Sequence, residues 1–309
     1  MDKKTRVSYS QFTKWQKCSQ WWAYDYIDKL AVPDQNIHTI FGTAMHTVIQ
    51  EWLTESVYGN KTLKYAKTVD LSERLQEELV KESTPWLKRV DDDGNEFYLF
   101  TVQELQEFYE QGLLIISYIQ ENLEKIFPTE NESLHSIEYP CEVDLGNGLY
   151  YIGYIDIVTY NIVYDEYTLW DLKATTKGWN KYTKKDKLKT DQVLIYKKFF
   201  SDIEGVPLEN INVEYVVMKR KLWESPYKIP RVSKFSPSDG PRSVKRAYEA
   251  FSQFVKDAHV KGERSYKKVV ATPSKSNCRF CPYADGVCSF AYNEKKEELL
   301  DNTEMVSLF

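Results

Sequence analysis

Two groups of residues in this chain have the types and the spacing to bind metal. The first is CRFCPYADGVC, residues 278–288, which holds three of the five cysteines in the 309-residue sequence. An odd number of cysteines argues against a disulfide framework, and the first residues lack the apolar segment of a secretory signal. We therefore expect a cytoplasmic protein with reduced thiols, whose clustered cysteines bind a metal or a metal cluster.

The second group is a set of charged residues inside two apolar segments. Asp156 lies in GYIDIV, and Asp171 and Lys173 lie in LWDLKAT. An ionised side chain in such a segment costs free energy unless it is paired or bound to metal. Residues i and i+2 of a strand point to the same face, so Asp171 and Lys173 should project together. Two carboxylates and a lysine on one face suit Mg²⁺- or Mn²⁺-assisted phosphodiester hydrolysis. The alternative is that Asp171 and Lys173 are exposed ends of an edge strand.

Three further polar residues could contribute to the same chemistry. His46 follows a Gly-Thr turn in FGTAMHTVIQEW, where Glu51 is a weaker candidate. Gln192 and Tyr196 are four residues apart in DQVLIYKKF and would share one face of a helix. Each of these residues alone is more often an ordinary helix residue.

A run of lysines lies between the Asp171 segment and the Gln192 segment. KGWNKYTKKDKLK, residues 177–189, contains six lysines and one acid, although the whole chain has a net charge of -5. An acidic balance argues weakly against nucleic-acid binding, and a lysine run is often only a solvated face. The role of the neighbouring segments decides between this interpretation and contact with phosphates.

The pattern of apolar residues predicts the elements that must position these groups. Periodicity near 3.6 indicates helices, and alternation with β-branched and aromatic residues indicates strands. Gly-Asn-Gly at residues 146–148 indicates a hairpin, Ser8 or Ser10 should cap the first helix, and Thr43 the second. No apolar run is long enough to cross a membrane. Helices are expected over residues 11–27, 43–55, 72–82, 102–127, 186–203 and 243–260, and strands over residues 136–148, 149–161, 167–175 and 211–222.

In chain order the sequence presents G-x-x-x-H, G-x-x-D, D-x-K and Q-x-x-x-Y, followed by the cysteines. This order resembles the PD-(D/E)XK nuclease superfamily, and within it the RecB-like branch that carries an iron–sulfur cluster. That branch includes the AddB nuclease domain and the CRISPR-associated iron–sulfur exonucleases. The resemblance implies a restriction-endonuclease-like α/β fold, in which helices flank a mixed sheet. The implied metal ligands are His46, Asp156 and Asp171; the implied catalytic residues are Asp156, Asp171, Lys173, Gln192 and Tyr196. The lysine run lies where the DNA backbone should pass in such a nuclease, which implies phosphate contacts from Lys177, Lys181, Lys184 and Lys185.

The resemblance also implies a role for the cysteines. Cys18, Cys278, Cys281 and Cys288 match the four ligands of a [4Fe–4S] cluster that joins the two ends of the domain. The alternative is a structural zinc site with the same four thiolates. Cys141, in an expected strand, is interpreted as an inert core thiol.

The resemblance implies one nuclease domain over residues 1–300. A helical region is expected over about residues 1–130, a catalytic core over 131–262 and a cluster segment over 263–300, followed by a tail over 301–309. The implied function is a metal-dependent DNA exonuclease that acts on DNA ends or on single strands, in replication, repair or recombination. A structure-specific endonuclease on the same fold and a non-catalytic DNA-binding or assembly factor are the alternatives.

The chain printed here ends in the apolar sequence MVSLF. This ending resembles the short C-terminal peptides with which replication proteins bind sliding clamps. The resemblance implies that Leu308 and Phe309 enter an apolar pocket of such a clamp. The alternative is that the tail contacts its own domain.

Overall fold

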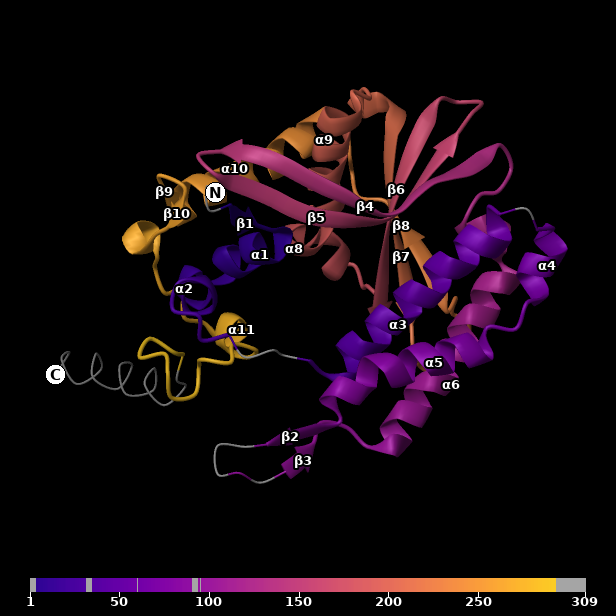
Figure 1. The fold of residues 1–309 in the computed structure, drawn as a ribbon, viewed down its shortest axis with the longest axis horizontal. Helices are drawn as coiled ribbons and strands as arrows, with labels where there is room; N and C mark the ends of the chain where they lie inside the picture. The colour runs from indigo at the N-terminus through magenta and orange to yellow at the C-terminus, as the bar shows by residue number, and fades with distance from the viewer. Residues whose placement is uncertain (1–3, 32–34, 60, 91–93, 95, 293–309) are drawn as a thin grey trace. The chain divides into compact units, whose positions relative to one another are not determined.

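The computed structural model describes residues 4–31, 35–59, 61–90, 94 and 96–292 (Figure 1). Leu308 and Phe309 lie outside these residues. The chain forms two compact units, each built from segments that are distant in the sequence. The first unit comprises Met1–Val32, Asp144–Tyr151 and Ala250–Phe309, and the second comprises Pro33–Val143 and Ile152–Glu249.

A mixed sheet is the centre of the second unit. Strand β6 (Glu166–Thr175) pairs antiparallel with β5 (Leu149–Asn161) and parallel with β7 (Ile211–Lys219). Strand β8 (Val232–Phe235) pairs antiparallel with β7, and β4 (Glu132–Gly146) pairs with β5. A parallel pair needs a crossover connection, and the helices between β6 and β7 provide it.

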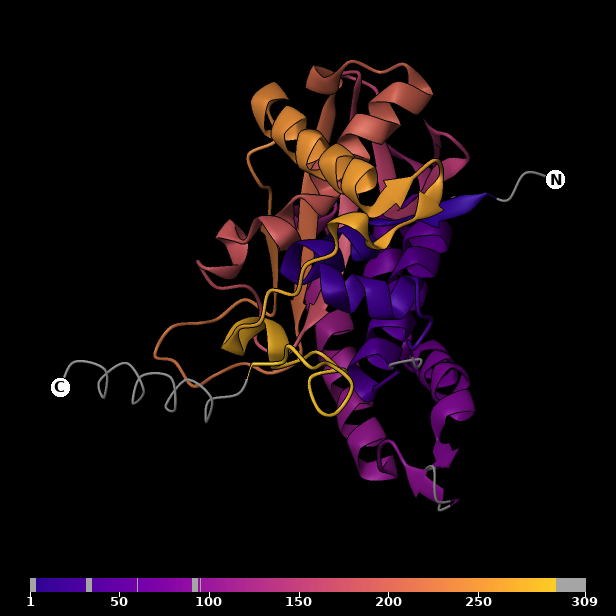
Figure 2. The ribbon, with the colours of Figure 1, turned by 90° about the vertical axis from the view of Figure 1, so that its left-hand side faces the viewer.

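Helices cover both faces of this sheet (Figures 1 and 2). Helix α3 (Ile37–Trp52) contacts β6 on one face. Helices α5 (Ser72–Ser83) and α6 (Val102–Glu121) contact α3, and α6 also contacts β8. Phe41, Met45 and Ile49 of α3 share a core with Trp170 and Leu172 of β6. Helix α9 (Gln192–Glu204) contacts β6 and β7. Helix α9 lies on the opposite face of the sheet. Residues 171 and 173 alternate along β6 with the core residues Trp170 and Leu172, so their side chains point toward α9.

Shorter elements complete the second unit. Helix α3 continues into a π-helical turn, Leu53–Val57, and a small hairpin joins α5 to α6. The remaining elements are α4 (Leu63–Thr68), β2 (Lys88–Val90), β3 (Glu96–Tyr98), α7 (Leu123–Ile126), α8 (Lys187–Thr190), the 3₁₀ turns Thr84–Trp86, Thr183–Lys185 and Leu208–Asn210, and the first half of α10 (Pro241–Ala258).

The first unit has an aromatic core. Phe12 and Trp22 lie on α1 (Tyr9–Lys17) and α2 (Ser19–Tyr26), and both rings contact Phe254 of α10. Strand β1 (Thr5–Val7) pairs in parallel with the first residues of β5. The other elements are β9 (His259–Val260), β10 (Glu263–Arg264), the 3₁₀ turn Tyr266–Lys268 and α11 (Lys275–Cys278).

The prediction of a mixed sheet flanked by helices is confirmed, as is the hairpin at residues 146–148. The prediction that Thr43 caps a helix is wrong. Helix α3 begins six residues earlier, where Asn36 and Thr39 form a capping box, and the Thr43 hydroxyl donates to the Thr39 carbonyl inside the helix. The first expected helix is two helices, because Cys18 is extended. Strands β1 and β8 were missed because both are short. Within the described residues, no helix is long and apolar enough to cross a bilayer.

Candidate active site

Strand β6 places a carboxylate and an ammonium on the face opposite α3. The Asp171 side chain is 2% exposed and that of Lys173 is 31% exposed, and Nζ of Lys173 lies 2.5 Å from Oδ1 of Asp171. The expected projection of both residues from one face is therefore present. The alternative, in which they are exposed ends of an edge strand, is wrong, because β6 lies between β5 and β7.

Asp156 reaches the same place from β5. The pairing of β5 with β6 extends to Ile157 and Trp170. Just beyond it, Oδ2 of Asp156 accepts a hydrogen bond from the backbone nitrogen of Leu172 at 2.6 Å. The Asp156 carboxylate therefore takes the place of a ladder carbonyl, which puts it beside Asp171. His46 of α3 approaches the same oxygen, with 3.6 Å between its Nδ1 and Oδ2 of Asp156.

Helix α9 supplies the two remaining predicted residues. Nζ of Lys173 donates to Oε1 of Gln192 at 3.2 Å. Nε2 of Gln192 donates in turn to the hydroxyl of Tyr196 at 3.2 Å. Tyr196 is 5% exposed, and burial raises the pKa of its hydroxyl, which stays protonated at neutral pH. The structure thus brings all six residues predicted for the metal and catalytic sites into one cluster.

Two residues of this cluster, Glu138 and Gln50, were not predicted from the sequence. Nε2 of Gln50 donates both to Oε1 of Glu138 at 2.6 Å and to the backbone oxygen of Asp156 at 2.9 Å. Glu138 lies in β4 with φ of 48°, a backbone conformation that is uncommon for residues other than glycine. Its charge contributes to raising the pKa of Asp156. The sequence did contain a signal for Glu138, which is an acidic residue in the strand that pairs with the strand of Asp156.

Burial controls the protonation of the cluster. It raises the pKa values of Asp156 and Asp171 to about 6, although the charge of Lys173 opposes the change. Burial and the charge of Lys173 lower the pKa of His46, which favours the neutral imidazole. Burial alone would lower the pKa of Lys173, but Asp171 and Asp156 raise it overall. At neutral pH the ammonium of Lys173, the carboxylates of Asp156 and Asp171 and the neutral ring of His46 therefore lie together.

The donor set fits a hard divalent cation. Two carboxylates provide the oxygen ligands that Mg²⁺ and Mn²⁺ prefer, and a neutral imidazole is an accepted further ligand. Oδ1 of Asp171 is buried and accepts no hydrogen bond of good geometry from the described residues. Across the described ranges, no group of three or more His, Cys, Asp or Glu side chains is placed, as it stands, to hold a metal ion. In this arrangement the cation beside Asp171 is the Lys173 ammonium.

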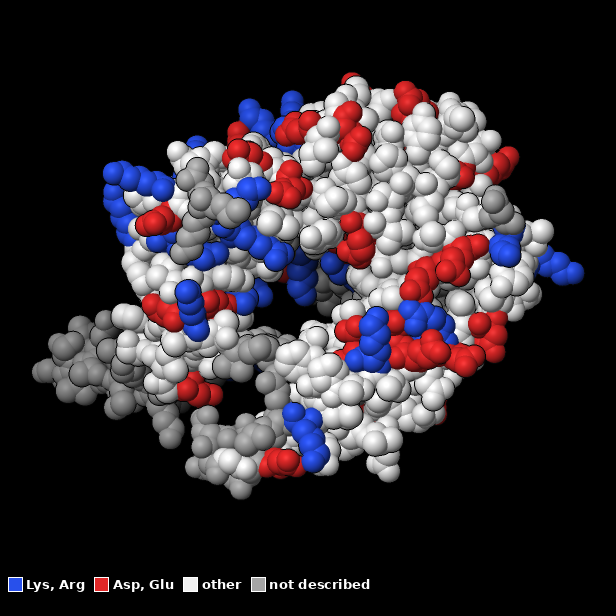
Figure 3. Space-filling view, in the orientation of Figure 1, with Lys and Arg blue, Asp and Glu red and all other residues white. Residues whose placement is uncertain are grey.

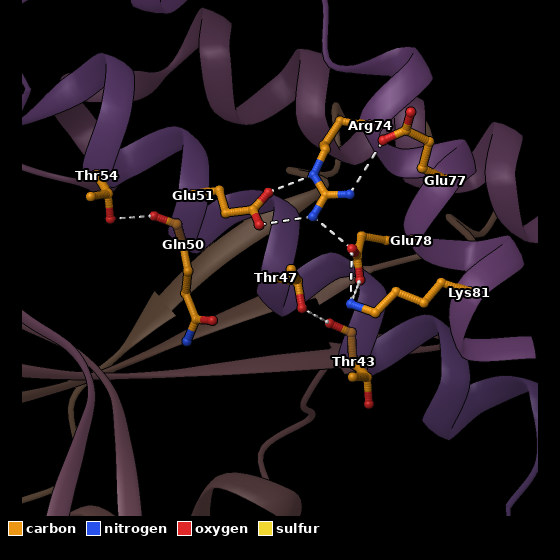
Figure 4. A network of polar contacts seen from close by, with 9 residues as sticks. All are labelled: Thr43, Thr47, Gln50, Glu51, Thr54, Arg74, Glu77, Glu78 and Lys81. Carbon is orange, nitrogen blue, oxygen red and sulfur yellow. Dashed lines mark hydrogen bonds and ion pairs between the residues drawn. The ribbon is translucent and has the colours of Figure 1, made fainter.

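Glu51, the weaker candidate, lies outside the cluster. Its carboxylate accepts from Nε and Nη2 of Arg74 at 2.6 and 2.8 Å, and Arg74 also pairs with Glu78, whose side chain is 1% exposed (Figure 4). Figure 3 shows charged side chains of both signs gathered over α5, the helix that carries Arg74. This network ties α3 to α5 and so fixes the helix that presents His46.

The lysine run leaves the sheet directly after β6. Residues 176–182 form a loop, and a 3₁₀ turn and α8 follow before α9. The ring of Trp179 contacts Tyr215 and Phe235, and Nζ of Lys184 lies 5.1 Å above the ring of Phe235. This anchoring leaves the other three predicted contacts exposed: Lys177, Lys181 and Lys185.

The four predicted cluster cysteines lie together in the first unit. Cys18 separates α1 from α2, Cys278 ends α11, and Cys281 and Cys288 follow in turns. Burial raises the pKa of Cys281, and the charges of Cys18, Cys288 and Cys278 raise it further. All four thiols are partly exposed, whereas Cys141 is buried in β4, which raises its pKa to about 12. The four thiols are therefore within electrostatic reach of one another.

Hydrogen bonds hold the two ends of this unit side by side. The Ser19 hydroxyl donates to the Val270 carbonyl at 2.8 Å and accepts from its nitrogen at 2.7 Å. The Lys17 carbonyl accepts from Thr272 and from Asn277. Residues on both sides of Cys18 and just before Cys278 are thus fixed without any contribution from the thiols.

A known protein family matches most of the chain. A family model described as the PD-(D/E)XK nuclease superfamily matches residues 6–289. That range contains every predicted site residue except Leu308 and Phe309. Among solved structures, the chain is similar to a protein from Eubacterium rectale described as "Putative exonuclease", with 11% sequence identity and a TM-score of 0.46. The similarity covers 81% of this chain and 79% of the other. No curated protein matches the sequence.

The raised pKa of Asp171 leads to a prediction about stability. A carboxyl whose pKa rises on folding stabilises the folded state fully below its unfolded pKa, near 4, and this contribution is lost as the pH rises through about 6. Asp171→Asn cannot ionise, so it should stabilise the metal-free protein at pH 8 by up to about 3 kcal/mol, and by less at pH 5. Urea unfolding in EDTA at both pH values measures this difference. A gain that does not depend on pH would contradict the explanation.

The contacts of Glu138 lead to a second prediction. Glu138→Gln removes a charge beside Asp156 and weakens the link through Gln50, so Mn²⁺ affinity should fall about tenfold. Calorimetric titration with Mn²⁺ measures the change. Glu142→Gln, an exposed carboxylate further along β4, is the matched control and should bind Mn²⁺ as the wild type does. Equal affinities for all three proteins would exclude Glu138 from the site.

Proposed function

The chain belongs to the PD-(D/E)XK nuclease superfamily, and from this membership we propose that it is a divalent-metal-dependent DNA exonuclease. The observation that carries the proposal is that Asp156, Asp171 and Lys173 lie together where the β5–β6 pairing ends. The preference for DNA ends over internal sites follows the sequence resemblance to iron–sulfur exonucleases. An endonuclease on the same fold is the alternative that the substrate test below distinguishes.

Asp156, Asp171 and His46 would hold the metal. A bound divalent cation supplies charge that polarises the phosphate and acidifies a coordinated water. Asp156 keeps its orientation because the Leu172 backbone nitrogen and Gln50 fix its carboxylate and its carbonyl. His46 is kept neutral by burial and by Lys173, so its nitrogen is available as a ligand.

Lys173 and its neighbours would act on the phosphate. The ammonium remains protonated beside Asp171 and can donate to a phosphate oxygen on which negative charge develops. Gln192 accepts from Lys173 and thereby fixes the direction of its side chain. The protonated hydroxyl of Tyr196 is a further donor for the scissile phosphate.

The lysine run would hold the DNA backbone on its way to the metal. Phosphate contacts position a nucleic acid without reading its sequence. We therefore assign Lys177, Lys181, Lys184 and Lys185 to phosphate binding. Binding should weaken steeply with salt, as counterions are released from the DNA.

We also propose that Cys18, Cys278, Cys281 and Cys288 hold a [4Fe–4S] cluster. Four thiolates are the usual ligand set, and hydrogen bonds to the sulfurs tune such clusters. The backbone nitrogen of Tyr292 lies 3.4 Å from Sγ of Cys278 and donates to it. Since the cluster would connect α1 and α2 with the segment after α11, its role would be structural.

A role in replication, repair or recombination, with a sliding clamp as partner, rests on the sequence alone. Leu308 and Phe309 would be the clamp contacts, and both lie outside the described residues. Such a short peptide would raise the local concentration of the nuclease at replicating DNA.

The proposed activity predicts the effect of three substitutions. Asp156→Ala, Asp171→Ala and Lys173→Ala should each reduce cleavage at least about a hundredfold, because each removes charge that acts in the transition state. The assay is digestion of 5′- and 3′-labelled single- and double-stranded DNA with Mg²⁺ or Mn²⁺. Glu55→Gln, an exposed carboxylate in the π-helical turn that follows α3, is the control and should retain activity.

The same assay tests exonuclease action. Covalently closed single-stranded circles should survive, whereas linear strands of the same sequence are digested. Digestion of the circles would favour the endonuclease. Full cleavage by Asp171→Ala would exclude the assigned metal site, and no cleavage by the wild type under any condition would favour the non-catalytic DNA-binding factor.

The proposed cluster predicts a coloured protein. Anaerobically purified protein should be brown, with absorbance near about 400 nm from iron–thiolate bonds. Cys18→Ala should lose the colour and unfold at a lower temperature, and Cys141→Ala, outside the set, should keep the colour. A colourless protein with one zinc ion per chain would support the zinc alternative instead.

A further inference from the structure

The connection between β7 and β8 is an exposed loop of aromatic and basic residues. We call residues 220–231, RKLWESPYKIPR, the aromatic loop; it contains four basic residues and one acid, Glu224. Trp223 is 52% exposed and Tyr227 is 81% exposed. The loop extends away from the sheet in Figure 2, where it is orange. Large rings held in water and surrounded by positive charge are typical of surfaces that bind nucleic acid strands.

The base of the aromatic loop is held rigidly, whereas its tip is exposed. Lys219, the last residue of β7, donates from its backbone nitrogen to the Arg231 carbonyl at 2.9 Å and from Nζ to the Pro230 carbonyl at 2.7 Å. Nη1 of Arg231 donates to the Arg220 carbonyl at 2.7 Å. The Arg220 guanidinium lies 3.8 Å above the ring of Phe108. The exposed rings are therefore carried on a closed loop with fixed ends.

The aromatic loop starts beside the lysine run. Strands β6 and β7 are parallel and end together, with Thr175 opposite Lys219. Past this pair, the backbone nitrogens of Arg220 and Lys221 donate to the carbonyls of Thr175 and Thr176, both at 2.9 Å. Gly178, with φ of 86°, contacts the Lys219 side chain so closely that an added Cβ would lie 2.6 Å from Cε. Both segments therefore leave the sheet at the same end of β6 and β7. This end lies two residues, or about 7 Å along the strand, beyond Lys173.

We propose that Trp223 and Tyr227 stack on unpaired bases, and that the substrate of this site is a single DNA strand. The inference rests on the proposed nuclease function and deepens it. The lysine run contacts phosphates, and the aromatic loop contacts bases that have left the duplex. In a duplex the faces of internal bases are covered by their neighbours, so exposed rings gain a partner only where the strand is unpaired. Stacking tolerates any sequence because every base has a π-face.

The test compares a strand that has bases with one that lacks them. Binding of a fluorescein-labelled oligothymidylate and of an abasic strand of equal length is measured by anisotropy in EDTA, which prevents cleavage. The variant with both Trp223→Ala and Tyr227→Ala should bind oligothymidylate at least about tenfold more weakly. Its affinity for the abasic strand should change less than about twofold, and Trp223→Phe should remain close to the wild type.

Tyr164→Ala is the matched control. This ring is 71% exposed on the turn between β5 and β6, at the opposite end of β6 from Thr175. It should bind both strands as the wild type does. Thermal unfolding of every variant checks the fold.

The proposal is overturned if the double variant binds oligothymidylate as tightly as the wild type, or loses equal affinity for both strands. Equal loss would mean that the rings support the conformation of the loop or contact the sugar-phosphate backbone, and do not stack on bases. The outcome is separate from that of the nuclease assay. Base-dependent binding by a protein that cleaves nothing would support the aromatic loop and contradict the nuclease, whereas cleavage without base-dependent binding would do the reverse.

Discussion

A carboxylate that is almost completely buried is the constraint on which the rest of the second unit depends. The Asp171 side chain is 2% exposed in the middle of β6. An isolated ion at such a position would lower stability by several kcal/mol. Lys173 supplies the opposite charge at 2.5 Å, and burial still raises the pKa of Asp171 to about 6. The site is therefore destabilised in the absence of a further cation, which is an arrangement expected of a metal site.

The surrounding elements are fixed so that this cluster cannot relax. Helix α3 presents His46 and Gln50 four residues apart, on the same side, toward Asp156. Arg74 joins α3 to α5 through Glu51, and Asn36 caps the helix at its start. On the opposite face, α9 begins next to Asp191, a buried residue that accepts two hydrogen bonds from Arg246 at 2.7 Å. Both helices that carry site residues are thus anchored by ion pairs outside the site.

The first unit holds together segments that are far apart in the sequence. Backbone and side-chain hydrogen bonds between residues 17–19 and 270–277 do so without the thiols. The ring of Tyr283 contacts that of Tyr24, and its hydroxyl donates to Asp25 at 2.6 Å. The proposed cluster would therefore bind to a preformed arrangement, and this arrangement explains how four separated cysteines come within reach of one another.

The sequence by itself determined many of the local elements and the residue types that could do chemistry. The alternation around Asp171 and Lys173 fixed which side of β6 they share, because the pleat has a period of two residues. Gly-Asn-Gly fixed the hairpin, and the order of the motifs indicated the family. Tertiary structure decided what depends on distant partners. Gln50 links Glu138 to the site through a hydrogen bond, and the ion pair with Arg74 holds Glu51 outside the site. The aromatic loop lies beside the lysine run because β6 and β7 pair in parallel and end together. The local sequence of a strand does not specify which strand pairs with it.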